Sequence, residues 1–311
     1  MTSSPRAGAR GLALPMHLSI LLLTLTAQAG TSTSADEVIV VTGARTKDAI
    51  GALPYSTTAL GEREIANGRP TLSLGESLSQ VPGVFVAAQS NYSQDTRISI
   101  RGFGARAPFG VRGIRLFLDG IPLTLPDGQS QIDSLDLANI DRMEILRGPA
   151  ASLYGNAAGG VLYLETKDPG PVPEAEVFNL VGAFETWKLA ASGRARVGET
   201  GVSLFASRTQ TDGFREQSGT EQVVAQARTV SQLADNVRLS AIIHWFDSPR
   251  ADDPGGLTPE QFRATPSAAA AVNERFGTGE AVSQLQAGTR LVASSDDARH
   301  RVEATVHAGL R

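Results

Sequence analysis

Two kinds of hydrophobic pattern divide the chain. Between residues 97 and 166, short apolar runs alternate with turns rich in glycine and proline. This pattern predicts a compact sheet with irregular connections. From residue 175 onward, segments of roughly ten residues alternate apolar and polar positions, which is typical of strands with one apolar and one polar face. The chain therefore predicts a small globule followed by a different, strand-rich part.

The alternation is clearest in residues 187–197, 237–246 and 301–310. A soluble sandwich also alternates, but a transmembrane barrel turns its apolar row to lipid and its polar row inward. The links favour the barrel, because short turns (198–201, 234–236, 294–298) alternate with longer links at 212–220 and 248–280. We expect the long link at 248–280 outside the cell. About seven strands fit, too few to close a barrel around a plug, so we expect the chain to be the N-terminal part of a longer protein.

Within the globule, residues 71–80 predict a short helix that presents Leu74, Leu78 and Val81 on one face. Thr71 is a candidate cap, and the Pro-Gly pair at 82–83 ends the helix. A helical turn is expected at 136–140.

The N-terminus has the order of an export signal. Arg6 and Arg10 precede a short apolar run at 18–25, and Ala27-Gln28-Ala29 follows it. This predicts a signal peptide over 1–29; an N-terminal anchor or a buried helix is the alternative. No apolar run reaches the length of about 20 residues that a membrane-spanning helix needs.

Composition narrows the chemistry. The 311 residues carry a net charge of -4 and no cysteine, so neither a nucleic-acid-binding stripe nor a thiolate site is expected. Residues 102–107 fit a loose dinucleotide fingerprint, but Pro108, Gly110 and Gly113 prevent the helix that must follow. We expect no enzyme activity, no catalytic residues, no cofactor and no metal site, and we interpret His244, His300 and His307 as interior or surface residues.

A polar stretch at 30–36 leads into a run rich in β-branched residues, which favours an extended strand. On a flexible leash, this strand is suited to pair with the edge of another protein's sheet; an ordinary first strand of the next domain is the alternative. The segment consists of Glu37, Val38, Ile39, Val40, Val41, Thr42 and Gly43.

The motif order resembles the TonB-dependent outer-membrane receptors. The matching motifs are LGESLSQVPGV (74–84), SIRGFG (99–104), LDGIPL (118–123) and IDRMEILRGPAASLYGNAAGGVLYLETK (140–167). The resemblance implies a TonB box at 37–43 within a flexible segment over 30–48. It also implies a mixed α/β plug domain over 49–169 and the first strands of an antiparallel transmembrane β-barrel, all-β and truncated, over 170–311. The implied function is energised uptake through the outer membrane of a Gram-negative bacterium, with a TonB-type coupling protein as partner.

The ligand site is expected on plug loops 89–95, 105–112 and 125–131. Arginines beside an aromatic ring suit a planar anion; pairing of Arg106 and Arg112 with barrel carboxylates is the alternative. The candidate ligand-binding residues are Tyr92, Gln94, Arg106, Phe109, Arg112, Asp127 and Gln129.

Within the family, residues 91–131 most resemble the pyrroloquinoline quinone receptors, and residues 255–266 are similar to their outer loop. Ferric citrate and ferric siderophore receptors share the plug motifs and remain an alternative. A non-energised channel or a surface-binding protein is the alternative from another class.

Charged residues on the plug strands have two interpretations. They either pair with charges of the barrel wall or form a solvated sheet face. These residues are Arg142, Glu144, Arg147 and Glu165.

Overall fold

A computed structural model describes residues 40–41, 48–49, 56–87, 91–94, 96–107, 110–148, 151–297 and 299–311. Of the predicted TonB box, only Val40 and Val41 are among them. These two form β1 (Val40–Val41), which pairs antiparallel with β2 (Asp48–Ala49). The rest of the box, Phe109 and the predicted signal peptide lie outside the described residues.

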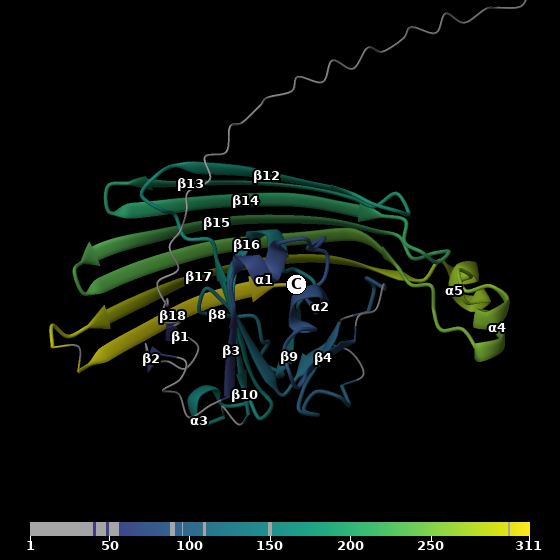
Figure 1. The fold of residues 1–311 in the computed structure, drawn as a ribbon, viewed down its shortest axis with the longest axis horizontal. Coiled ribbons are helices and arrows are strands. Elements are labelled where there is room, and N and C mark those ends of the chain that lie inside the picture. Colours follow the sequence, from purple (N-terminus) through teal and green to yellow (C-terminus); the bar gives the residue numbers. More distant parts are fainter. Residues whose placement is uncertain are drawn as a thin grey trace, which may run out of the picture. The chain divides into compact units, whose positions relative to one another are not determined.

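A five-stranded sheet organises the first half of the described chain (Figure 1). In spatial order its strands are β3 (Ser56–Leu60), β10 (Ile140–Arg147), β11 (Gly160–Thr166), β7 (Ile114–Leu118) and β8 (Ile121–Pro122). The β11–β7 pair is parallel and the other pairs are antiparallel. Gly160 begins β11 at a φ of +139°, where a Cβ would collide with the carbonyl oxygen of Leu146. Only glycine fits this junction.

Short elements surround this sheet. They are the helices α1 (Glu62–Ala66), α2 (Gly75–Leu78) and α3 (Ala151–Tyr154), the 3-10 turn η2 (Leu137–Asn139), the pair β4 (Val84–Ala87) and β5 (Arg97–Ile100), and the pair β6 (Val111–Arg112) and β9 (Gln129–Ser130). The turn predicted at 136–140 is confirmed by η2, which the Asp136 side chain caps at the Ala138 N–H. Among the described residues, no helix combines the length and apolar character needed to cross a membrane.

The helix predicted over 71–80 is wrong in its extent and its cap. Thr71 has a φ of +59°, which is not a capping geometry, and α2 covers only four residues. Instead, the Glu76 carboxylate accepts the backbone N–H groups of Thr71, Leu72 and Ser73 at 2.7–2.9 Å. A side chain inside the helix thus satisfies the donors that precede it, and the segment forms a tight loop.

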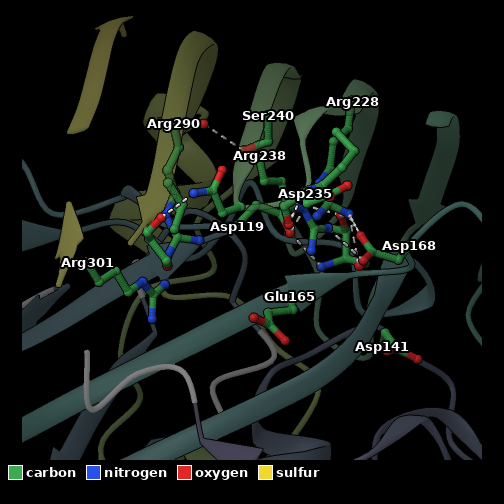
Figure 2. Close-up of a pocket in the computed structure, with 15 residues that line it drawn as sticks. Asp119, Asp141, Glu165, Asp168, Arg228, Asp235, Arg238, Ser240, Arg290 and Arg301 are labelled. Atoms are coloured by element: carbon green, nitrogen blue, oxygen red, sulfur yellow. Dashed lines mark hydrogen bonds and ion pairs between the residues drawn. The ribbon is translucent and has the colours of Figure 1, made fainter. Parts of the chain in front are cut away.

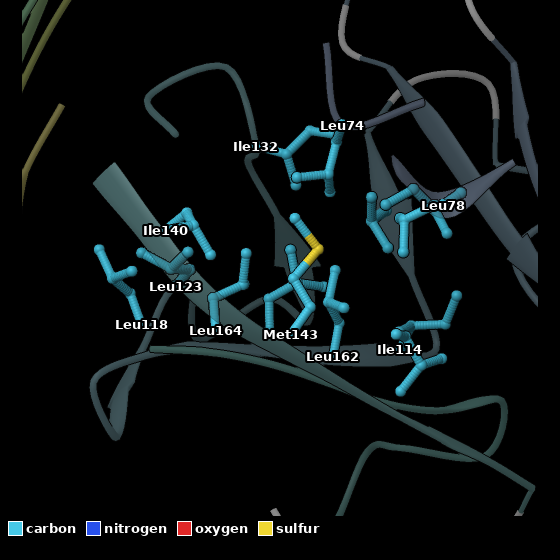
Figure 3. Packing of buried hydrophobic residues seen from close by; sticks show 14 of the residues in the cluster. Leu74, Leu78, Ile114, Leu118, Leu123, Ile132, Ile140, Met143, Leu162 and Leu164 are labelled. Carbon is cyan, nitrogen blue, oxygen red and sulfur yellow. The ribbon is translucent and has the colours of Figure 1, made fainter. Parts of the chain in front are cut away.

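The globule has its own apolar core (Figure 3). Met143, Ile114 and Leu116 are completely buried, and Leu74 and Leu78 reach them from the segment of α2. Among the described wall residues, only Ile242 joins this cluster. The first half therefore has a core that depends very little on the strands that follow it.

The second half is one antiparallel sheet of seven strands in sequence order, as the alternation predicted (Figure 1). Its strands are β12 (Glu174–Val181), β13 (Trp187–Val197), β14 (Thr200–Thr211), β15 (Thr220–Ala234), β16 (Val237–Asp252), β17 (Gly279–Ser294) and β18 (Arg301–Leu310). The links at 182–186, 212–219 and 253–278 define a long-loop end, and the short turns define the opposite, short-turn end.

The two faces of this sheet differ as expected. Leu189, Ile243 and Val306 lie on the apolar row and are 49%, 56% and 73% exposed. On the opposite row, Lys188 and His244 are buried against the first half. The polar row therefore faces the globule, and the apolar row faces away from it.

The link 253–278 carries two helices, α4 (Pro259–Ala264) and α5 (Ala271–Phe276). Thr258 and Gln261 form a reciprocal capping box at the start of α4. We call residues 253–278 the excursion.

Candidate functional site

The interface between the globule and the sheet is built around charged groups, and the tightest contact involves Lys188. Its ammonium lies 2.7 Å from the Asp136 carboxylate and donates to the Thr71 carbonyl at 2.8 Å. The Ser207 hydroxyl of β14 donates to the same carboxylate at 2.6 Å. The Lys188 side chain is only 2% exposed, so this ion pair is removed from water and hydrogen-bonded on both sides.

A second group of wall cations reaches the globule toward the short-turn end (Figure 2). Arg228 of β15 lies 2.6 Å from Asp168 and 3.6 Å from Asp119, and Arg238 of β16 lies 3.0 Å from Asp168. Burial alone would raise the pKa of Asp168, but the two guanidinium groups hold that pKa below its usual value. Asp168 is therefore a stable anionic anchor between the two halves.

A cavity of about 610 Å³ adjoins these pairs, and Figure 2 shows carboxylates and guanidinium groups on its walls. Glu165 lines it from β11. Burial, and then repulsion from Glu144, raises the pKa of Glu165 to about 7. On the opposite wall, Arg290 donates to the Tyr163 hydroxyl at 3.1 Å. The cavity is thus a hydrated, charged space within the interface.

The four plug charges named from the sequence have different partners. Arg142 pairs with Glu144 at 2.8 Å inside the globule, while Arg147 donates to the Pro82 carbonyl and to the Thr58 hydroxyl at 2.8 Å. Glu165 faces the charged cavity. Sequence reasoning expected wall pairing on the right strands but missed the carboxylates that provide it, which are Asp119, Asp133, Asp136 and Asp168.

The histidines occupy interior and surface positions. His244 is 2% exposed, and its two ring nitrogens contact the Ser134 carbonyl at 3.0 Å and the Gln226 side chain at 3.2 Å. His300 and His307 are exposed. Within the described residues, no group of three or more His, Cys, Asp or Glu side chains could hold a metal ion.

At the long-loop end, a plug segment contacts the excursion. Asn91 and Gln94 donate to the Asp253 carboxylate at 2.8 and 3.3 Å. A cavity of about 490 Å³ lies here, lined by both amides, Asp253, Arg215 and residues 254–256. Of the seven predicted ligand-binding residues, Gln94 is the one that lines it.

The other predicted residues are placed elsewhere. Arg112 lies 3.4 Å from Asp127 and donates to Gln129 at 2.8 Å, so these three form one group. Tyr92 is largely buried, and burial, followed by the nearby charge of Glu76, raises its pKa. Arg106 is exposed.

The pairing suggested for Arg112 with barrel carboxylates is therefore wrong in one respect. The carboxylate of its ion pair, Asp127, belongs to the plug, and the Arg112 side chain remains 45% exposed. Sequence reasoning missed Asp253 and Arg215 altogether, and the only available signal was the density of Asp, Pro and Gly at 252–256.

These features define a class of protein. A globule with its own core contacts the polar face of an antiparallel sheet whose other face is apolar, which is the arrangement of a plugged outer-membrane barrel. We now call the globule the plug and the sheet the wall.

Comparison with known proteins identifies the family. Residues 50–161 match the family model described as TonB-dependent Receptor Plug Domain. The vitamin B12 transporter BtuB of Vibrio vulnificus (strain CMCP6) is 25% identical over 231 residues, which is 71% of this chain and 37% of the relative. The ferrichrome outer membrane transporter/phage receptor of Escherichia coli (strain K12) is 33% identical over 138 residues, 44% of this chain and 17% of the relative.

The fold agrees with these matches. The structure of FpvA from P. aeruginosa bound to heterologous pyoverdines superimposes with a TM-score of 0.64 at 16% identity, covering 83% of this chain and 34% of that one. The chain belongs to the TonB-dependent receptors of the Gram-negative outer membrane. It spans between 25% and 37% of the length of the first curated relatives it matches.

Proposed function

We propose that the protein takes up a small ligand across the outer membrane, using energy delivered through its N-terminal segment. The observation that carries this proposal is that the plug keeps its own apolar core and meets the wall mainly through polar pairs. Polar contacts can be exchanged for water one at a time, whereas an apolar core is lost cooperatively. A plug built this way can rearrange inside a barrel while it stays folded.

The proposed partner is a TonB-type energy-coupling protein that binds residues 37–43. The pairing of Val40 and Val41 with β2 supports this, because a segment that already adopts a strand can add to a partner's sheet edge. The proposal keeps the division of the chain into an export signal at 1–29, a linker with the box at 30–48, a plug at 49–169 and wall strands at 170–311.

The proposed ligand is a small anionic molecule, with pyrroloquinoline quinone as the first candidate and ferric citrate or a ferric siderophore as the second. The half-exposed Arg112 guanidinium and the exposed Arg106 support an anion. Relatives named as vitamin B12, hemin and ferrichrome receptors support the second candidate.

Deleting residues 37–43 in the receptor expressed in a Gram-negative host tests the energised step. We expect uptake of the bound ligand to be lost, while binding, measured by titration with pyrroloquinoline quinone and with ferric citrate, is unchanged. Deletion of the preceding residues 31–36 is the matched control and should leave uptake intact. Uptake that survives the 37–43 deletion would instead support the non-energised channel.

A further inference from the structure

One carboxylate joins the plug to the excursion at the long-loop end. Asp253 Oδ1 accepts the Asn91 side-chain N–H at 2.8 Å and the Gly255 backbone N–H at 2.9 Å, while Oδ2 accepts the Gln94 side-chain N–H at 3.3 Å. Asn91 and Gln94 are 162 and 159 positions away in sequence. Two neutral amides of the plug thus share one charged acceptor of the wall.

Asp253 itself is held by the excursion and not by the plug. Its backbone N–H donates to the Thr278 carbonyl at 2.9 Å. Its own carbonyl accepts from Asn273 at 3.2 Å and from the Thr278 hydroxyl at 3.1 Å. These bonds close the base of the excursion, so the carboxylate stays in place when its plug partners leave.

The cation beside the cavity has no equivalent freedom. The Arg215 guanidinium donates to the carbonyls of Pro254, Gly255 and Ala268 at 2.6–3.1 Å. These bonds occupy its donors in tying two loops together. Among the described lining residues, the charged group with exchangeable partners is therefore the Asp253 carboxylate, which is an acceptor.

We propose that this cavity binds the hydrogen-bond-donating part of the ligand, and that its ammonium, hydroxyl or amide N–H groups replace Asn91 and Gln94 on Asp253. A cationic donor competes well, because a hydrogen bond between two charged groups is stronger than one from a neutral amide. The exchange frees plug segment 91–94, so Asp253 is a positioning residue that reports occupancy to the plug. This inference rests on the proposed function for the identity of the occupant as a transported ligand. The acceptor groups of such a ligand are left for arginines such as Arg112.

Hydrogen–deuterium exchange at Ser93 and Gln94, in the whole receptor in detergent, tests the exchange of partners. In Asp253→Asn the amide that replaces one carboxylate oxygen donates instead of accepting, so we expect exchange about tenfold faster than in the wild type. Gln94→Ala removes a bond from the plug side and should raise exchange in the same direction, even if Asp253→Asn disturbs the excursion. Glu260→Gln, on the exposed surface of α4, is the matched control and should change nothing.

Two probes test the ligand chemistry. Millimolar 1,4-diaminobutane, which carries only donors at neutral pH, should accelerate exchange at 91–94 in the wild type and add nothing in Asp253→Asn. Benzene-1,3,5-tricarboxylate, which carries only acceptors, should not. Unchanged exchange in Asp253→Asn, no response to the diamine, or a response to the tricarboxylate instead would overturn the proposal. Because none of these readouts is uptake, the 37–43 deletion can fail or succeed independently.

Discussion

The interior of the plug and its contact with the wall are built on opposite principles. The interior is made of fully buried aliphatic side chains such as Ile114, Leu116 and Met143. The contact places Lys188 against Asp136, and Arg228 against Asp119 and Asp168. Apolar burial holds a domain together without directional constraint, whereas buried ion pairs add little net stability but penalise any mismatch. The difference teaches that the plug is made to be folded by itself and to be seated specifically.

The largest expected effect comes from breaking the seat. Lys188→Met leaves the Asp136 carboxylate buried without its cation and should cost about 3–5 kcal/mol in plug unfolding, measured by urea titration of the receptor in detergent. Arg238→Met is the matched control, because its pair with Asp168 is about half exposed and should contribute no more than about 1 kcal/mol. Equal losses in the two variants would contradict the importance of burial.

A somewhat smaller effect is expected from the interior. Met143→Ala removes a completely buried side chain from the plug core and should cost about 2–5 kcal/mol in the same titration. The control is Leu189→Ala on the exposed apolar row of the wall, which should leave plug unfolding unchanged. If the loss in Met143→Ala were instead no larger than in this control, the plug would not depend on its own core.

The smallest effect concerns pH and the charged cavity. Burial and then Glu144 raise the folded-state pKa of Glu165 to about 7, above its ordinary value of 4.5. The folded plug therefore keeps this proton longer than the unfolded chain, so the stability from Glu165 is full below about pH 4.5 and is lost as pH rises through about 7. The difference in unfolding free energy between the wild type and Glu165→Gln should change by at most about 3 kcal/mol over that window. A difference that does not vary with pH would place Glu165 in a water-like environment.

How far the sequence reached differs between local and distant relations. The strands 187–197 and 301–310 were predicted with their observed bounds, because alternation is a property of neighbouring residues. The helix at 71–80 was wrong in extent, because Glu76 takes up backbone donors that helix propensity alone does not reveal. The group of Arg112, Asp127 and Gln129 joins two of the predicted loops, while Gln94 belongs to a different cavity. The role of the seven residues in ligand binding stays a prediction.

By itself, the sequence determined which face of each wall strand is apolar, where most strands lie, and that an independent globule precedes them. These follow from hydropathy and turn chemistry, which act over a few residues. Only the tertiary structure decided that Lys188 meets Asp136 across 52 positions and that Asp253 meets Asn91 across 162. One polar row offers many cations and the plug offers many carboxylates, so their pairing is selected by the packing of two finished units and not by any local signal.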